Sequence, residues 1–310
     1  MTKRIMVTGG AGFVGSHLCE RLLRDGHSVI CLDNFCTGPY KNIESFFDRS
    51  FELCRKNVIT LSDRDTPDVD EIYNLACPAS PIHYQKDPIF TWETCVFGAS
   101  AVLEFAAACG AKVLQASTSE IYGEPFEHPQ NELSKGYVNT VGIRSCYDEG
   151  KRAAETLFAD YRRSGIDARI VRIFNTYGPR MQVDDGRVVS NFICQALRNE
   201  NITVYGDGRQ TRSLCYVGDL VDGLVRAMEK PYPGVMNLGN PDETSVYELA
   251  GEIISLTGSA SEIRFHPLPS DDPTRRKPNI NKAMLNLDWW PMVDRQTGLL
   301  ETIEYFRSVL

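Results

Sequence analysis

The sequence lacks an excess of positive charge and lacks any long uninterrupted apolar segment. Its 310 residues carry 33 Lys and Arg against 41 Asp and Glu, a net charge of −8. This balance argues against a general nucleic-acid or anionic-membrane binder, so an anionic ligand must be met by locally placed arginines. Charge or glycine interrupts each apolar stretch within about 10 residues, whereas a membrane span needs about 20. We therefore expect no membrane helix.

The sequence also lacks paired cysteine motifs. Its 10 cysteines are scattered without a CxxC spacing, and several lie in apolar runs such as VICLD and SNFICQAL. This distribution favours buried free thiols over a disulfide framework or a zinc site, so no metal is expected. The amino terminus, MTKRIMVTGG, is typical of a strand and not of a secretory signal. We expect a cytoplasmic protein.

Apolar, β-rich segments alternate with helical patterns through the first half of the chain. Strands are expected at RIMVT, SVICL, EIYNLA, KVLQAS and ARIVRIF, and helices at about 13–25, 88–109 and 145–164. The alternation predicts a Rossmann-type α/β fold, a doubly wound parallel sheet with helices on both faces. We expect a first domain over 1–174, rejoined by the chain within about 213–240, and a smaller α/β lobe over 175–310.

A glycine-rich segment follows the first expected strand. The string GGAGFVG places Gly9, Gly12 and Gly15 at the spacing G-x-x-G-x-x-G, with Phe13 and Val14 between the last two. A helical pattern begins at the same point. In this context the backbone N–H groups and the helix N-terminus face a pyrophosphate. The segment therefore predicts a dinucleotide site.

Asp33 ends the second expected strand and is followed by Asn34. A carboxylate at this place accepts hydrogen bonds from a ribose diol and repels a 2′-phosphate, which favours NAD over NADP. The alternative is that Asp33 is an ordinary turn residue in the string DNF.

The string RSCYDEGKR sets Tyr147 four residues before Lys151, on one face of a helix. We expect the ammonium to lower the pKa of the phenol from about 10 toward the working range of a base. With a nicotinamide cofactor, Tyr147 would take the proton of an alcohol as hydride leaves its carbon, and Thr118 could hydrogen-bond the same hydroxyl. The alternatives are a chance pair and a threonine that only ends a strand.

These motifs together resemble the extended short-chain dehydrogenase/reductase superfamily over essentially the whole chain. Longer strings are similar to the UDP-glucuronate decarboxylases, or UDP-xylose synthases: NLACPASPIHYQKDP, STSEIYGEP, HPQ, GIRSCYDEGKR, RIFNTYGPRM, DGRVVSNFI, TVYGDGRQTRS and RRKPNI. The resemblance implies that NAD oxidises C4 of UDP-glucuronate, carbon dioxide leaves the β-keto acid, C5 is protonated, and C4 is reduced again. It also implies a homodimer through the helices near 88–109 and 145–164.

The same resemblance implies roles for individual residues. Glu120 matches an acidic residue near the sugar carboxylate and C5, and Arg276 matches an arginine that holds the carboxylate and assists protonation of C5. Tyr84 matches a tyrosine that contacts substrate. The other expected substrate-binding residues are Ser119, Asn175, Arg187, Tyr205, Gln210 and Arg212. The alternatives are a surface carboxylate for Glu120, a solvated basic run for Arg276 and a core aromatic for Tyr84.

Two strings depart from the patterns of relatives. Dehydratases of the superfamily follow the threonine with Asp-Glu, whereas this chain has Ser119 and lacks that acid, which argues against dehydration. Decarboxylases commonly carry Tyr-Trp and Pro-Ile after HPQ, whereas this chain has Ser134, Lys135, Thr140 and Val141. A thymidine diphosphate sugar therefore stays open as substrate. Also open are a nucleotide-sugar 4-epimerase and a non-enzymatic NAD-sensing module, although the intact Tyr and Lys argue against the latter.

Overall fold

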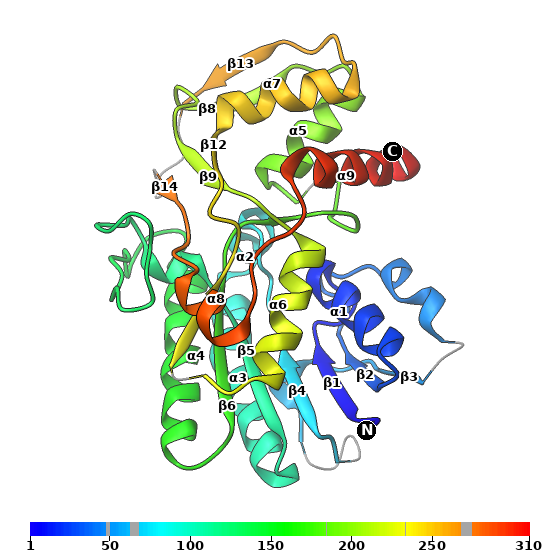
Figure 1. Cartoon of the computed structure of the whole chain (residues 1–310), viewed down its shortest axis with the longest axis vertical. Helices are drawn as coiled ribbons and strands as arrows, with labels where there is room; N and C mark the ends of the chain where they lie inside the picture. Colours follow the sequence, from blue (N-terminus) through cyan, green and yellow to red (C-terminus); the bar gives the residue numbers. More distant parts are fainter. Residues whose placement is uncertain (48–49, 63–67, 184, 233, 268–274) are drawn as a thin grey trace.

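The protein has two lobes, with the N-terminus at the foot of the lower one and the C-terminus in the upper one (Figure 1). The computed structural model describes residues 1–47, 50–62, 68–183, 185–232, 234–267 and 275–310. The lower lobe contains a large sheet covered by helices on both faces. The upper lobe contains shorter strands and three helices. The expected α/β architecture is confirmed.

The large sheet has seven strands in the order β11-β6-β5-β4-β1-β2-β3, and every neighbouring pair is parallel. The strands are β1 (Arg4–Thr8), β2 (Ser28–Leu32), β3 (Phe51–Cys54), β4 (Glu71–Asn74), β5 (Lys112–Thr118), β6 (Ala168–Ile173) and β11 (Val235–Leu238). The five strands expected in the first half are all present. The strand β3 was not predicted, because it is a four-residue edge strand with an exposed Glu52 at its centre.

Helices cover both faces because the strand side chains alternate. In β1, Ile5 and Val7 pack with α1 (Phe13–Arg24) and α6 (Val217–Glu229), whereas Met6 packs on the other side with α3 (Pro88–Cys109) and α4 (Ser145–Arg163). This is the period of two that a strand imposes on its side chains. After α6 the chain returns to the sheet as β11, beside β6.

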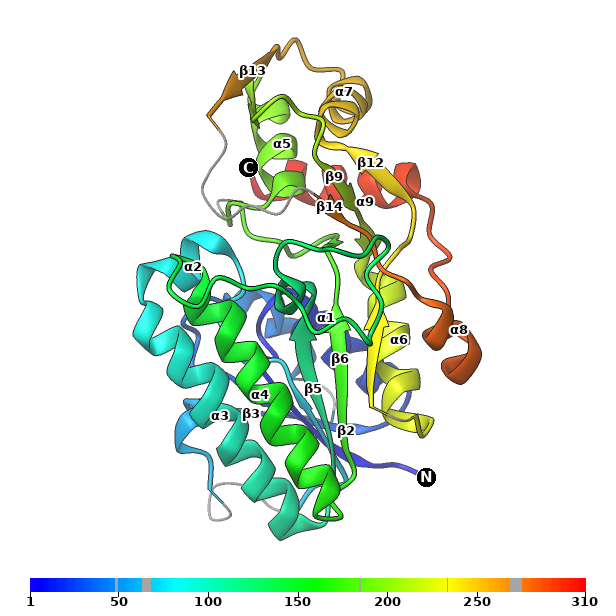
Figure 2. The same cartoon turned by 90° about the vertical axis from the view of Figure 1, so that its left-hand side faces the viewer.

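The helix α3 lies along α4 on one face of the sheet (Figure 2). By length and composition alone, α3 could cross a membrane. Half of its most apolar window is buried inside the protein, as in the core helix of a globular domain. Its exposed apolar side chains include Ile89, Trp92 and Phe97.

The upper lobe has its own core. The helices α5 (Val188–Leu197), α7 (Val246–Thr257) and α9 (Arg295–Val309) enclose this core next to the parallel pair β8 (Ile202–Tyr205) and β13 (Ile263–His266). Between the lobes lies a small sheet of β12 (Glu243–Ser245), β9 (Thr211–Ser213) and β14 (Arg275–Arg276). The remaining elements are β7 (Thr176–Tyr177), which pairs with β10 (Cys215–Tyr216), the helices α2 (Pro81–Lys86) and α8 (Asn281–Leu287), and the short 3-10 helices η1 (Tyr40–Asn42), η2 (Glu44–Phe46), η3 (Val58–Thr60) and η4 (Ser119–Tyr122).

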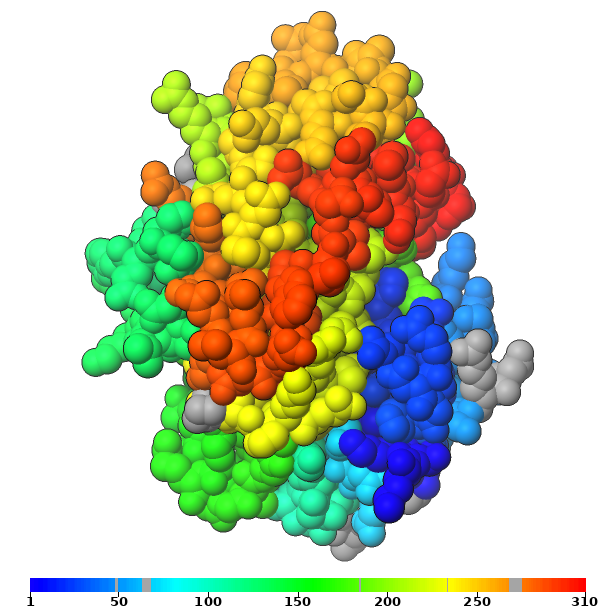
Figure 3. All heavy atoms as spheres, viewed as in Figure 1, coloured from blue at the N-terminus to red at the C-terminus, as the bar shows by residue number. Residues whose placement is uncertain are grey.

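The segment between η4 and α4 is irregular. It projects from one side of the molecule, next to the small sheet (Figure 3). Bridges from Gly123 to Tyr137 and from Gln130 to Pro278 hold it in place. Its exposed apolar side chains are Phe126, Leu133, Tyr137, Val141 and Ile143.

A buried ion pair ties α4 to the sheet. Arg172 of β6 donates to both carboxylate oxygens of Glu155, at 2.9 and 2.8 Å, and also to the hydroxyl of Tyr122, at 2.9 Å. The Tyr122 hydroxyl in turn donates to Asn237 of β11, at 2.8 Å. The network connects η4, α4, β6 and β11 beneath the loop that begins at Gly123.

We predict that Glu155→Ala lowers the free energy of unfolding by about 3–5 kcal/mol, because it leaves the Arg172 guanidinium buried without its counter-ion. Urea denaturation followed by circular dichroism measures this. The matched control is Glu104→Ala, which removes an exposed carboxylate of α3 and should change stability by less than about 0.5 kcal/mol. Equal midpoints for wild type and Glu155→Ala would contradict the prediction.

Candidate active site

A cleft of about 640 Å³ lies between the two lobes, at the carboxyl ends of the strands of the large sheet. This is where ligands of open α/β sheets bind. All the expected site residues line it: Gly9, Gly12, Phe13, Val14, Gly15, Asp33, Asn34, Tyr84, Thr118, Ser119, Glu120, Tyr147, Lys151, Asn175, Arg187, Tyr205, Gln210, Arg212 and Arg276. The fold thus brings together residues that are up to 267 positions apart in the sequence.

The glycine-rich loop opens α1 with its N-terminus at the cleft. Gly12 is the N-cap residue, and no side chain caps this end of the helix. A Cβ added to Gly15 would lie 2.1 Å from the carbonyl oxygen of Gly9, so the close packing of the loop requires glycine. An uncapped helix N-terminus with a close-packed glycine loop suits a pyrophosphate. The residues present therefore fit a dinucleotide.

Asp33 is buried beside this loop. One carboxylate oxygen accepts a hydrogen bond from the N–H of Ala11, at 2.9 Å, and the other from Phe35, at 2.8 Å. Burial raises the pKa of Asp33, and these backbone hydrogen bonds oppose the shift. The second bond is the local turn contact that the alternative interpretation predicts. The backbone N–H of Asn34 is a third donor, and the carboxylate still has room to accept one more hydrogen bond, so Asp33 can hold the turn and also bind a ribose.

Tyr147 and Lys151 lie on α4 as predicted, but their electrostatics differ from the prediction. Burial raises the pKa of Tyr147 well above its ordinary value, and a hydrogen bond with Thr118 only partly opposes this. The Lys151 ammonium donates to the carbonyl of Ala116, at 2.9 Å, and lies 5.8 Å from the centroid of the Tyr147 ring. The prediction of a lowered phenol pKa is therefore wrong for the protein without ligands, because loss of hydration outweighs the nearby cation.

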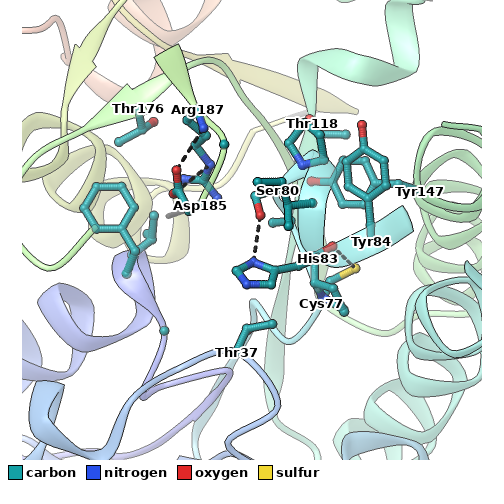
Figure 4. Close-up of a pocket in the computed structure, with 18 of the residues that line it drawn as sticks. Thr37, Cys77, Ser80, His83, Tyr84, Thr118, Tyr147, Thr176, Asp185 and Arg187 are labelled. Carbon is teal, nitrogen blue, oxygen red and sulfur yellow. Dashed lines mark hydrogen bonds and ion pairs between the residues drawn. The ribbon is translucent and has the colours of Figure 1, made fainter. Parts of the chain in front are cut away.

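Tyr84 of α2 stacks on Tyr147, with ring centroids 5.1 Å apart and planes 7° from parallel (Figure 4). Its hydroxyl is buried and finds no hydrogen-bond partner among the described residues. The same holds for Oδ1 of Asn175 and Nε of Arg276. Buried polar atoms are normally hydrogen-bonded. Three such atoms around one cleft indicate a polar ligand.

Glu120 lies between two arginines at the cleft. Its Oε2 accepts hydrogen bonds from Arg144, at 2.5 Å, and from Arg276, at 3.3 Å. Burial alone would raise the pKa of Glu120, but the charges of Arg276 and Arg144 outweigh it and lower the pKa to about 2. Arg276 is only 2% exposed. The alternatives of a surface carboxylate and a solvated basic run are therefore wrong.

Sequence reasoning missed Arg144 and Asp148 of this cluster. Arg144 Nε lies 3.9 Å from Asp148 Oδ2. Burial and the charge of Glu120 raise the pKa of Asp148 to about 7. The available signal was the string GIRSCYDEGKR, in which Arg144 and Asp148 are four residues apart and flank Tyr147. Opposite charges at that spacing in a helix pair on one face.

The opposite wall of the cleft carries Arg187, near the start of α5, and Asp185, whose carboxylate lies 3.5 Å from its guanidinium (Figure 4). Arg212 of β9 is buried, whereas Tyr205, at the end of β8, is 45% exposed. Gln210 donates to the Tyr205 carbonyl, at 2.6 Å. The upper lobe thus presents the guanidiniums of Arg187 and Arg212 to the cleft, together with the neutral side chains of Tyr205 and Gln210.

The residues that depart from the decarboxylase pattern lie outside the cleft. Ser134 and Lys135 line a separate small hollow in the projecting loop. Thr140 and Val141 are exposed, and within the described part of the chain none of the four lines the cleft.

Comparison with known proteins agrees with this geometry. Residues 5–239 match the family described as the NAD dependent epimerase/dehydratase family. The chain is 52% identical over 307 residues to UDP-glucuronic acid decarboxylase 1 of Arabidopsis thaliana, which covers 98% of this chain and 70% of that protein. It is 51% identical over 310 residues to UDP-glucuronic acid decarboxylase 1 of Xenopus tropicalis, with 99% and 73% covered.

Two solved structures are similar over nearly their full length. The UDP-glucuronic acid 4-epimerase of Bacillus cereus, in complex with UDP-glucuronic acid and NAD, has a TM-score of 0.89 and 27% identity, covering 99% of this chain and 100% of that one. The UDP-glucose 4-epimerase of Thermotoga maritima, with UDP-glucose, has a TM-score of 0.90 and 28% identity, covering 99% of each chain. The expected cofactor, NAD, is that of the matched family. The chain belongs to the NAD dependent epimerase/dehydratase family and, within it, to the UDP-glucuronic acid decarboxylases.

Proposed function

We propose that this protein converts UDP-glucuronate to UDP-xylose and carbon dioxide, with no net oxidation or reduction. The observation that carries the proposal is the position of Glu120 between Arg276 and Arg144, in the same cleft as Tyr147 and Lys151. An alcohol oxidation needs only the last two residues. The guanidiniums of Arg276 and Arg144, which flank the partly buried Glu120, add the cationic hydrogen-bond donors that binding of a sugar carboxylate requires.

The cofactor would be held by the glycine loop and Asp33, whose donors and acceptors fit a pyrophosphate and a ribose. When bound, NAD supplies the hydride acceptor for C4 and the hydride donor for the return step. The residues of this chain provide the rest. Thr118 and Tyr147 are hydrogen-bonded neighbours at the cleft wall, so both can reach one sugar hydroxyl. Tyr147 takes the proton of that hydroxyl, and the Lys151 ammonium, 5.8 Å from the centroid of its ring, opposes the effect of burial on the phenol.

The cluster of Arg276, Glu120 and Arg144 handles the carboxylate. The two guanidiniums attract the anionic end of the sugar, while the ionised Glu120 repels it, so that loss of carbon dioxide relieves a like-charge contact. Arg276 has one nitrogen without a partner among the described residues and can bind the carboxylate without losing its present contacts. The guanidiniums do not give up a proton and Glu120 is ionised, so the cluster assists protonation of C5 by holding the sugar in place, and the proton comes from water.

The alternatives have less support. A 4-epimerase of UDP-glucuronate would use Tyr147 and Lys151 and would also bind the sugar carboxylate, but the 52% identity to a UDP-glucuronic acid decarboxylase favours decarboxylation over the epimerase, to which the chain is 27% identical. The sequence argument for a thymidine nucleotide depends on loop residues such as Ser134 and Lys135. These residues lie away from the cleft, so they give no support for that nucleotide. An NAD-sensing module would not need the catalytic pair.

We also propose a homodimer and a cytoplasmic location. The exposed Ile89, Trp92 and Phe97 of α3 give the α3–α4 face an apolar surface for a second copy. All ten cysteines lie in the described part of the chain and none of them forms a disulfide there, which suits a reducing compartment.

For the cofactor, Asp33→Ala should reduce the preference for NAD over NADP, because it removes the charge that repels a 2′-phosphate. Dissociation constants for both nucleotides measure the ratio. Asp33→Asn is the matched control for the turn, because its amide oxygen can still accept a backbone hydrogen bond. Equal binding of the two nucleotides by the wild type would contradict the role of Asp33.

Tyr147→Phe should keep NAD and substrate binding but lose about 10²- to 10⁴-fold in turnover, because it removes the acid/base group. Steady-state kinetics and binding measurements separate the two effects. In contrast, Tyr84→Phe should mainly raise KM, since it keeps the stacked ring and removes only the hydroxyl. Unchanged turnover in Tyr147→Phe would remove this tyrosine from the mechanism.

Arg276→Ala should lower kcat and raise KM for UDP-glucuronate while leaving NAD affinity unchanged, because it removes a ligand of the carboxylate. Arg275→Ala, at the adjacent exposed position, is the control and should behave like wild type.

NMR should show UDP-xylose formed by the wild type with only catalytic NAD. A six-carbon uronate epimerised at C4 would instead support the epimerase, and stoichiometric NADH with a free 4-keto pentose would contradict the closed redox cycle.

A further inference from the structure

Two cysteines meet at the wall of the cleft. Cys77 follows β4, Cys95 lies in the second turn of α3, and their sulfur atoms are 3.2 Å apart. With Tyr84 and Tyr147 they form one small packed cluster. Neither thiol has a role in the reaction proposed above.

The pair is open to the cleft on one side only. Cys77 is partly exposed and lines the cleft beside Tyr84 (Figure 4), whereas Cys95 is 2% exposed and lies behind it. A small reagent in the cleft therefore meets Cys77 first, with a second thiol already in contact. Cys19 and Cys31, beneath the glycine loop, are both fully buried and lack such access.

The two thiols have unequal proton affinities. Burial would raise the pKa of Cys77, but the hydrogen bond with Cys95 and the charge of Lys151 outweigh it and lower the pKa. The hydrogen bond with Cys77 and burial raise the pKa of Cys95. Cys77 is thus the partner that loses its proton more readily. An accessible nucleophilic thiol beside a resolving thiol is the arrangement of redox-sensing cysteines.

We propose that Cys77 and Cys95 are an oxidisable pair, whose disulfide reversibly inactivates the enzyme, and that the oxidant is a small hydroperoxide. The Cys77 thiolate attacks the terminal peroxide oxygen and breaks the O–O bond, forming a sulfenic acid and releasing the alkoxide, or hydroxide where the oxidant is hydrogen peroxide. The Cys95 thiol then attacks the Cys77 sulfur, forming the disulfide and releasing water. Two electrons pass from the two sulfurs to the peroxide, and no other reactant is needed.

The disulfide acts on the catalytic residues through Gly150. A Cβ added to Gly150 would lie 2.9 Å from Cys95 Cβ and 3.2 Å from its sulfur, so Cys95 packs directly on the backbone of α4. Gly150 lies between Tyr147 and Lys151. Bond formation shortens the sulfur–sulfur distance from 3.2 Å to about 2.05 Å. The movement therefore occurs at the helix turn that positions both catalytic side chains.

The test treats the full-length protein, with and without NAD, with hydrogen peroxide. We expect a Cys77–Cys95 cross-linked peptide in the mass spectrum and a fall of about tenfold or more in kcat/KM. Dithiothreitol should remove the cross-link and restore kcat/KM. Bound NAD should slow the modification, because it fills the cleft in front of Cys77. The activity readout rests on the proposed function, whereas the peptide map does not. Absence of UDP-xylose formation under reducing conditions would contradict the proposed function, and the peptide map would still show whether Cys77 and Cys95 form a disulfide.

The variants Cys95→Ser and Cys95→Ala should give no cross-link and should instead accumulate a Cys77 sulfenic acid, trapped by dimedone. Cys109→Ser is the matched control, since it removes a thiol of the same helix about 21 Å along its axis and should oxidise like wild type. A different cysteine pairing would overturn the proposal. So would a complete Cys77–Cys95 cross-link that leaves kcat/KM unchanged.

Discussion

The ion pair between Glu120 and Arg276 joins the two lobes at the site where they must cooperate. Glu120 stands on the 3-10 turn after strand β5, and Arg276 belongs to β14 of the small sheet between the lobes. Arg276 also donates to the carbonyl of Gly123, at 2.6 Å, which fixes the turn itself. The geometry of the cleft therefore depends on a contact between residues 156 positions apart.

The same contact explains why a largely buried carboxylate can remain ionised. An isolated carboxylate in the interior would take up a proton, and Asp148, one helical turn from Arg144, shows this tendency in its raised pKa. Glu120 differs because Arg144 reaches it from α4 and Arg276 from the small sheet. The charged groups of the site therefore come from three elements, η4, α4 and β14, and tertiary packing brings them together.

This dependence on packing marks what the sequence could predict. The glycine loop, the strand before it and Asp33 are local signals within about 30 residues, and all were located correctly. The edge strand β3 was missed because half-exposed pairing leaves little apolar pattern in four residues. The pKa of Tyr147 was predicted in the wrong direction because spacing reveals the nearby lysine but not the loss of hydration. Arg144 was missed because its contact with Glu120 spans 24 residues.

The pairing of β14 with β9 sets Arg276 directly beside Arg212, on neighbouring parallel strands. Strands in a sheet are about 4.8 Å apart, and like charges in adjacent positions repel each other. The two guanidiniums are therefore close together although both are almost inaccessible to water. In the proposed function, Arg276 binds the sugar carboxylate, and Arg212 is a further substrate-binding residue on the next strand. The backbone hydrogen bonds of the two short strands thus set the separation between two cationic side chains at the cleft.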